Sequence, residues 1–190
     1  MLYLMIIIFT IIVGLLRGGE LESLIHITIE GVYLFAASLF LRSAIWFLEF
    51  INLSIFLPYG TILLVISYFL LIFASIKNIK LPGFKYITLG ILLNSFVIIV
   101  NHGKMPVLVS QKIGQNIDQN SLLENGKSIV HSLKNSGTLF SFLGDVIPLP
   151  RLFLGNAVLS VGDILIFAGI FILIQKVMMR ENSQKPEIIE

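Results

Sequence analysis

The chain has 190 residues, of which 56% are hydrophobic and 13% are charged, with a mean hydropathy of +0.96 and a formal net charge of +2. Soluble domains contain about 25% charged residues, so this composition excludes a water-soluble globular fold. The excess apolar surface predicts a single integral membrane domain. Because the net charge is small and the basic residues are scattered, nucleic acid is not an expected partner.

Residues suited to redox or metal chemistry are scarce. The chain contains no cysteine, which rules out disulfides, thiolate nucleophiles and Cys-bound metals. It contains three histidines, at positions 26, 102 and 131, so a metal site built from imidazole is sparsely supplied. We therefore predict no cofactor and no metal site.

Apolar segments predict five transmembrane helices, over residues 1–16, 24–48, 59–76, 86–100 and 158–178. The first has no basic n-region and no small-residue cleavage site, so we expect a retained helix rather than a signal peptide. The third contains no charged residue and ends before lysines and Pro82-Gly83, which suit a helix C-terminus and a turn. The predicted fold class is an all-α membrane protein, with one membrane domain over residues 1–178 and a polar tail over residues 179–190.

The second segment contains three ionisable residues. His26 and Glu30 are spaced i, i+4 and would share one face of a helix. Glu30 and Arg42 would lie ~18 Å apart along a continuous helix axis. We therefore expect Glu30 and Arg42 near opposite membrane faces.

The distribution of lysine and arginine predicts the orientation in the cell membrane. With five spans, the first loop, the third loop and the tail share one side, which has seven basic residues: Arg17, Lys77, Lys80, Lys85, Lys176, Arg180 and Lys185. The short segments on the other side have none, and a long loop counts weakly because long loops are translocated largely regardless of charge. We predict an extracytoplasmic N-terminus, a cytoplasmic C-terminus and an extracytoplasmic loop over residues 101–156.

Two segments of the long loop have membrane-surface character. Residues 127–134 fit one or two turns of an amphipathic helix lying on the membrane. Residues 138–155 are as apolar as a membrane segment, but they are too short to span and contain two prolines, which interrupt a helix. We expect the second segment to be re-entrant or interfacial, with Asp145 and Arg151 either paired by burial or exposed at the headgroup level.

Most polar residues near the helix ends have structural explanations. Ser160 and Asp163 have the spacing of a capping box at the start of the last helix. The alternative is that the Asp163 carboxylate faces the same cavity as Asp145. Asn94 lies well inside the fourth span, where an amide is expected to bond a neighbouring helix, with a contribution of roughly 0.6 kcal/mol. Gly103 fits the C-cap of that span.

A second interpretation brings the outer polar residues together as a ligand-binding cluster. Its members are Asn101, His102, Lys104, Asp145, Arg151 and Asp163. A buried Asp145 is costly to ionise without a cation, so Lys104 or Arg151 is predicted to neutralise it. In this interpretation residues 101–104 contact residues 144–150 beneath the outer membrane surface, where they would hold a polar head group.

Four motifs are found in the chain: RGG at 17–19, NHGKMPV at 101–107, FLGDVIPLP at 142–150 and SVGD at 160–163. Together they resemble a family of small bacterial multi-pass membrane proteins catalogued as a domain of unknown function. The resemblance extends over nearly the whole chain and implies a multi-pass fold. It implies no activity, cofactor or site residue.

The leading function class is a non-catalytic membrane protein. Such a protein would be a scaffold, an accessory subunit or a module that binds a small molecule or lipid. Its expected partners are membrane lipids and either another membrane protein or further copies of the chain.

Two other classes stay open. An oligomeric transporter or channel would need ionisable groups at mid-depth, and the third and fifth spans have no charge at their centres. A membrane-embedded hydrolase or transferase acting on a lipid or envelope precursor would use Asp145, Asp163 and His102 as acid and base groups. In that class Lys104 or Arg151 would hold an anion, but the chain contains neither an HExxH nor a GxSxG motif.

Overall fold

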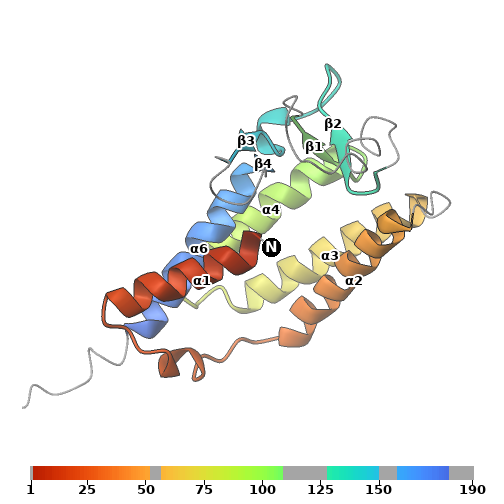
Figure 1. The fold of residues 1–190 in the computed structure, drawn as a ribbon. Coiled ribbons are helices and arrows are strands. Elements are labelled where there is room, and N and C mark those ends of the chain that lie inside the picture. The colour runs from red at the N-terminus through yellow and green to blue at the C-terminus, as the bar shows by residue number, and fades with distance from the viewer. Residues whose placement is uncertain (1, 52–56, 109–127, 150–157, 180–190) are drawn as a thin grey trace, which may run out of the picture.

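The computed structural model describes residues 2–51, 57–108, 128–149 and 158–179. Within these ranges the chain is mostly helical, and its five α-helices run alternately up and down (Figure 1): α1 (Leu2–Leu16), α2 (Val32–Phe50), α3 (Leu57–Lys77), α4 (Phe84–Val100) and α6 (Val161–Met178). Helices α2 and α3 form a hairpin, α4 packs on α6, and α1 lies along α6. Arg151 and most of the predicted tail lie outside the described residues.

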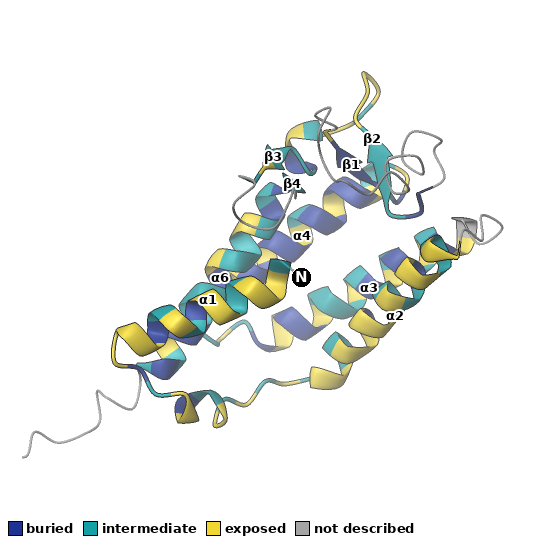
Figure 2. Cartoon of the chain, viewed as in Figure 1, coloured by how far each residue is buried: buried dark blue, intermediate teal, exposed yellow. Residues whose placement is uncertain are grey.

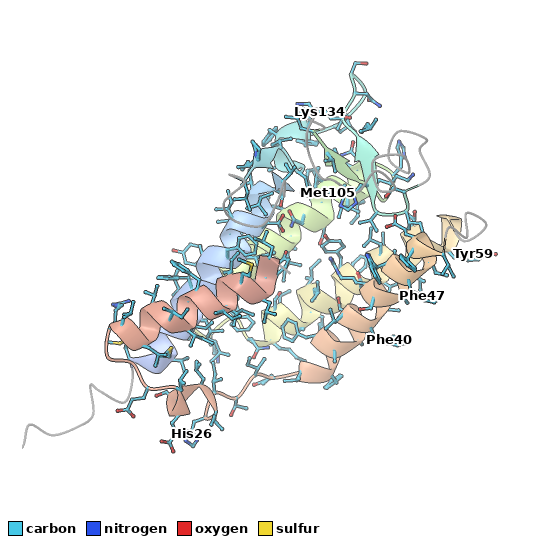
Figure 3. The ribbon with its side chains drawn as sticks, viewed as in Figure 1. His26, Phe40, Phe47, Tyr59, Met105 and Lys134 are labelled. Carbon is cyan, nitrogen blue, oxygen red and sulfur yellow. The ribbon has the colours of Figure 1, made fainter. Side chains whose placement is uncertain are left out.

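Three helices are long and apolar enough to cross a membrane: α2, residues Tyr59–Lys77 of α3, and α6. The remaining two, α1 and α4, are apolar but shorter, with 15 and 17 residues. Large apolar side chains cover the outward faces, as Phe40 and Phe47 show on α2 (Figure 3). Figure 2 shows the buried residues between the helices and the exposed ones on the outside. This distribution suits a bundle surrounded by lipid.

Helix boundaries agree with the apolar segments at three of the five helices. The predicted segments 1–16, 59–76 and 86–100 match α1, α3 and α4 to within two residues at each end. The last helix begins at Val161, three residues after the predicted start, because Ser160 caps it.

The second predicted segment, 24–48, is wrong at its start, since α2 begins at Val32. A short 3-10 helix, η1 (Glu22–Leu24), precedes an irregular stretch that ends at Gly31, where φ is +66°. The buried Asn78 amide stabilises this stretch: it donates to the Glu30 carbonyl at 2.8 Å and accepts from the Glu30 N–H at 2.8 Å. His26 and Glu30 therefore do not share a helix face, and that prediction is also wrong.

The later start of α2 changes the depth of Arg42. This residue is eleventh of nineteen in α2, so it lies near the helix centre rather than near an end. Its guanidinium carbon is 4.2 Å from the centroid of the Tyr68 ring on α3. A cation on an aromatic face in this position contributes to the pairing of α2 with α3.

Two pairs of glycines bring α4 and α6 into backbone contact. A Cβ on Gly169 would lie 2.6 Å from the Gly83 carbonyl oxygen, and a Cβ on Gly162 would lie 2.6 Å from the Gly90 carbonyl oxygen. Helices in membranes associate closely where small residues face each other. The close approach fixes the first turn of α6 beside the second half of α4.

Short strands form a cap over the upper ends of α4 and α6 (Figure 1). The cap contains η3 (Ser141–Leu143) and four strands in two pairs: β1 (Met105–Val107) parallel to β2 (His131–Leu133), and β3 (Ile147–Pro148) antiparallel to β4 (Val158–Leu159). The amphipathic helix predicted over residues 127–134 is wrong for residues 128–134. Residues 131–133 form β2, whose backbone bonds to β1 and not within a helix. Residues 138–149 belong to the cap, and their re-entrant or interfacial position stays a prediction.

One hydrophobic cluster joins the cap to the helices. Its buried members come from α2, α3, α4 and the cap: Ile45, Leu64, Val97, Ile98, Met105, Ile129 and Leu143. Each is at most 8% exposed. The cap is therefore packed on the bundle through apolar contact, which fixes the polar residues on its inner side.

Candidate functional site

Polar side chains from three helices meet where α6 begins, and we call Tyr3, Asn94, Ser160 and Asp163 the helix-start cluster. Ser160 and Asp163 form the predicted capping box: the Ser160 hydroxyl accepts from the Asp163 N–H at 2.9 Å, and the Asp163 carboxylate accepts from the Ser160 N–H at 3.1 Å. The expectation that Asn94 bonds a neighbouring helix is also confirmed, since its amide accepts from the Ser160 hydroxyl at 2.9 Å.

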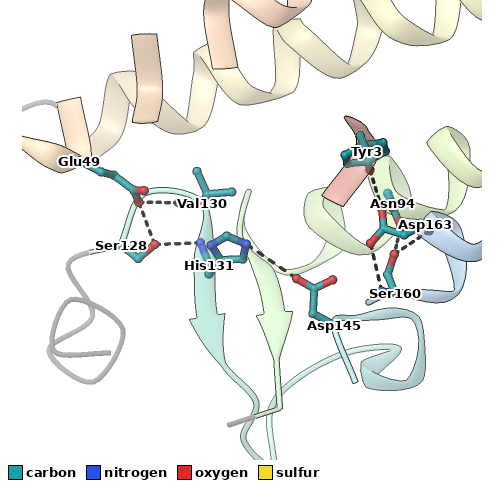
Figure 4. A network of polar contacts seen from close by, with 9 residues as sticks. All are labelled: Tyr3, Glu49, Asn94, Ser128, Val130, His131, Asp145, Ser160 and Asp163. Carbon is teal, nitrogen blue, oxygen red and sulfur yellow. Dashed lines mark hydrogen bonds and ion pairs between the residues drawn. The ribbon is translucent and has the colours of Figure 1, made fainter. Parts of the chain in front are cut away.

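The Asp163 carboxylate is well supplied with donors. Besides the Ser160 N–H, the Asn94 amide and the Tyr3 hydroxyl both donate to its Oδ1, each at 3.0 Å (Figure 4). Hydrogen bonds to the ionised form stabilise a carboxylate in a poorly solvated position. The cluster therefore ties α1, α4 and α6 together at one level of the bundle.

His131 and Asp145 lie together in the cap, and we call this pair the cap dyad. His131 pairs with Met105 and Asp145 pairs with Val107 across β1. Met105 and Val107 are two positions apart, so they and their partners share one sheet face. All three residues of β1 are buried, so the strand that holds the dyad is covered on both faces.

The cap dyad has an asymmetric exposure to solvent. His131 Nε2 lies 3.8 Å from Asp145 Oδ2, with side chains that are 41% and 15% exposed. Burial, with the Asp163 carboxylate as a smaller cause, raises the pKa of Asp145 to about 7. Burial lowers the pKa of His131, against the opposing effect of the Glu49 and Asp163 carboxylates. The Asp145 carboxyl therefore exchanges its proton near neutral pH, and burial favours the neutral form of the His131 imidazole.

Glu49, at the end of α2, holds the segment before β2. Its Oε1 accepts from the Ser128 hydroxyl at 2.8 Å, the Ile129 N–H at 2.5 Å and the Val130 N–H at 3.3 Å. The Ser128 hydroxyl in turn accepts from the His131 N–H at 3.1 Å (Figure 4). The position of β2, and with it the His131 imidazole, thus depends on a carboxylate of α2.

The five predicted site residues that the structure describes lie in different environments, and Arg151 lies outside the described residues. Asn101 caps α4, and its amide donates to the Leu139 carbonyl at 2.9 Å and accepts from the Leu139 N–H at 3.0 Å. His102 is exposed with φ +59°, and the Gly103 N–H donates to the Ile98 carbonyl at 2.8 Å. This is a Schellman-type helix end in which His102, rather than the predicted Gly103, is the first left-handed residue.

Backbone bonds join Asp145 to Pro106 and Leu108, just after the segment 101–104, whose own predicted contact with residues 144–150 stays a prediction. The Asp145 N–H donates to the Pro106 carbonyl at 2.8 Å, and the Leu108 N–H donates to the Asp145 carbonyl at 2.9 Å. Lys104 is half-buried just before β1. The basic group recorded beside the Asp145 carboxylate is His131, and Arg151 lies outside the described residues.

Three important residues were missed from the sequence. Glu49 bonds a segment about 80 residues away, and His131 pairs with Met105 and Asp145 through the cap, which no local spacing reveals. Arg42 was predicted near a membrane face, whereas it lies near the centre of α2. At its actual depth, Arg42 lies in the middle of α2 as Tyr68 does in α3 and Asn94 in α4. A polar residue in the middle of an otherwise apolar helix was the available signal for these three.

Metal binding receives no support from the described ranges, in which no group of three His, Asp or Glu side chains is placed to hold an ion. The site consists of a hydrogen-bonded carboxylate, an imidazole–carboxylate pair and a central guanidinium. Such groups bind protons and polar head groups.

Comparison with known proteins identifies relatives of the chain. The model of the Family of unknown function (DUF5317) matches residues 26–175. An "Uncharacterized protein" of Thermotoga maritima is 31% identical over 154 residues, which cover 81% of this chain and 79% of the relative. No solved structure matches the chain significantly. The matched range contains α2, α3, α4, the cap and nearly all of α6, so the chain belongs to the DUF5317 family.

Proposed function

We propose that the chain is a multi-pass integral membrane protein that binds the polar head group of a small molecule or lipid, without catalysing a reaction. The proposed site lies between the cap dyad and the helix-start cluster. Asp145 is the observation behind this proposal. Its carboxylate is 15% exposed, and among the described residues it accepts no hydrogen bond. A carboxylate of this kind has free acceptor capacity that a ligand donor can use.

The five helices support insertion in the bilayer. They alternate in direction, and their outward faces expose apolar side chains, so every helix can cross while the cap stays at one membrane surface. The basic residues of the sequence put the cap on the extracytoplasmic side. A ligand would then enter from outside or from the outer leaflet.

Binding is favoured over catalysis because the Asp163 carboxylate already accepts hydrogen bonds from the protein. The carboxylate accepts hydrogen bonds from Tyr3, Asn94 and Ser160, so it is poorly suited to take a proton from a substrate. A general base needs a free acceptor within reach of the proton that it removes. The Asp163 carboxylate instead holds α1, α4 and α6 together beside the ligand.

Native mass spectrometry of the full chain, released from nanodiscs made with host membrane lipids, tests the proposal. Wild type should retain a bound lipid or small molecule. Asp145→Asn should retain it about tenfold less, because one hydrogen bond to a charged group contributes about 1.5–3 kcal/mol. His102→Gln is the matched control, since His102 is exposed at the same end of the bundle. Equal retention by wild type and Asp145→Asn would overturn the assigned site.

An oligomeric transporter or channel is the second candidate, and Arg42 favours it. Ionisable groups at mid-depth commonly mark solute or proton routes, and Arg42 lies near the centre of α2. Proteoliposomes containing a pH-sensitive dye would report proton flux under an imposed potential. Flux above the leak of empty vesicles that falls in Arg42→Gln would support this function, and flux equal to the leak would exclude proton conduction.

A further inference from the structure

We propose that His131 and Asp145 form a proton-binding dyad, in which the imidazole is more exposed to solvent than the carboxylate. This role goes beyond ligand binding and does not depend on a ligand. The dyad would take up one proton from the outer solution at the imidazole and share it with the carboxylate.

The backbone fixes the geometry of the dyad. His131 and Asp145 lie on either side of β1, paired with Met105 and Val107, and both side chains project from the same sheet face. Figure 4 shows the imidazole of His131 directed toward the Asp145 carboxylate. At 3.8 Å the two polar atoms are slightly beyond a direct hydrogen bond, so a small side-chain rotation or one water completes the contact.

The two members of the dyad differ in exposure to solvent, and this difference determines where the proton enters. The imidazole is 41% exposed, whereas the carboxylate is 15% exposed. Water therefore reaches His131 more easily than Asp145, and the proton enters through the ring. The second ring nitrogen allows the imidazole to accept a proton on one side and donate on the other.

The surrounding charges favour one proton on the pair. Glu49 of α2 acts on His131, and Asp163 of α6 acts on both members of the dyad. Tyr68 of α3 interacts with Asp145 and with Arg42, which in turn acts on Tyr3 of α1. Burial and, as a smaller cause, the nearby Asp163 carboxylate disfavour the ionised form of Asp145 and raise its pKa.

The proton balance is simple. Neutral His131 with ionised Asp145 has a charge of −1, and binding one proton makes the pair neutral. That proton resides on the imidazole nitrogen or on the carboxylate oxygen, and no other bond forms or breaks. Because the two sites interact at close range, their titration steps belong to the pair rather than to either residue.

Histidine side-chain NMR on the full chain in nanodiscs tests the dyad, because the chain has three histidines and all can be labelled. His131 should show two titration inflections, one of them arising from Asp145. In Asp145→Asn, His131 should keep a single inflection, displaced by about one pH unit or more.

The wild-type spectra alone decide the question if Asp145→Asn does not fold. A single His131 inflection in wild type would overturn the proposal. So would an unchanged His131 titration in a folded Asp145→Asn. If Asp145→Asn loses ligand retention while His131 of wild type titrates in one step, the dyad is contradicted but the ligand site is not. The two proposals can therefore fail separately.

Discussion

At the scale of single residues, Asp145 determines how stability depends on pH. Its pKa of about 7 in the folded chain is above the ordinary value of 3.8, because it is buried near Asp163. The folded chain therefore binds this proton more tightly than the unfolded chain does. The resulting stabilisation is fully present below about pH 4 and is lost as pH rises to about 7.

Asp145→Asn should remove this dependence, since the amide resembles the protonated carboxyl. In thermal unfolding in detergent we expect the variant to equal wild type below about pH 4. At pH 8 it should be more stable, by up to about 4 kcal/mol at about 1.4 kcal/mol per pKa unit. A variant that is less stable at both pH values would instead show that Lys104 or Arg151 neutralises Asp145.

Asn94 provides a second test at this scale. Asn94→Leu removes the acceptor of the Ser160 hydroxyl and one donor to Asp163 inside the bundle. Each buried group that loses its partner costs about 1–3 kcal/mol, so we expect a clearly lower unfolding temperature. Ser95→Ala is the control, because the equally buried Ser95 bonds only the Ile91 carbonyl of its own helix. Equal losses in both variants would contradict the role given to Asn94.

At the scale of elements, contacts between helices determine where the polar groups meet. The glycines of α4 and α6 allow the backbones to touch, which puts Asn94 within reach of Ser160 and Asp163. Glu49 performs a comparable role between α2 and the segment before β2. The helix-start cluster and the cap dyad are therefore consequences of packing and not of one local motif.

Gly90→Ala should push α4 and α6 apart, because the added Cβ would meet the Gly162 carbonyl oxygen. We expect a loss of roughly 1–3 kcal/mol in the free energy of unfolding. Hydrogen exchange should also increase at the start of α6. Gly137→Ala is the control, because its Cβ would have only the Asn135 side chain at 3.4 Å. Unchanged stability in Gly90→Ala would mean that the helices can separate without cost.

At the scale of the whole molecule, two positions face opposite sides of the membrane when an odd number of membrane-crossing helices lies between them. Ser136 and Glu22 are both exposed, and α2, α3 and α4 lie between them in the chain, so they should face opposite sides. In intact cells, an impermeant thiol reagent should label Ser136→Cys but not Glu22→Cys, against a background without cysteine. The reverse pattern would invert the orientation, and labelling of both would contradict an odd number of crossings.

Apolar length predicted most helices, and local spacing predicted the capping box of Ser160 and Asp163. Both depend on residues that are neighbours in the sequence. The start of α2 was missed because Asn78, more than 40 residues away, supplies the hydrogen bonds that a helix would supply at Glu30. The pairing of β2 with β1, and hence the partnership of His131 with Asp145, depends on contacts across the long loop. Sequence spacing contains no information on such contacts.

The unequal lengths of the helices have a consequence for the surrounding lipid. At 1.5 Å per residue, the 15 residues of α1 and the 17 of α4 extend about 23 and 26 Å, less than the ~30 Å hydrocarbon core of a typical bilayer. Helix α3, with 21 residues, extends about 32 Å and has no such deficit. With all five helices inserted, hydrophobic mismatch would thin the membrane most beside α1 and α4, the two shortest helices. The unfolding temperature should therefore be higher in nanodiscs of short-chain lipids than in long-chain ones, and the opposite order would indicate that α1 does not span.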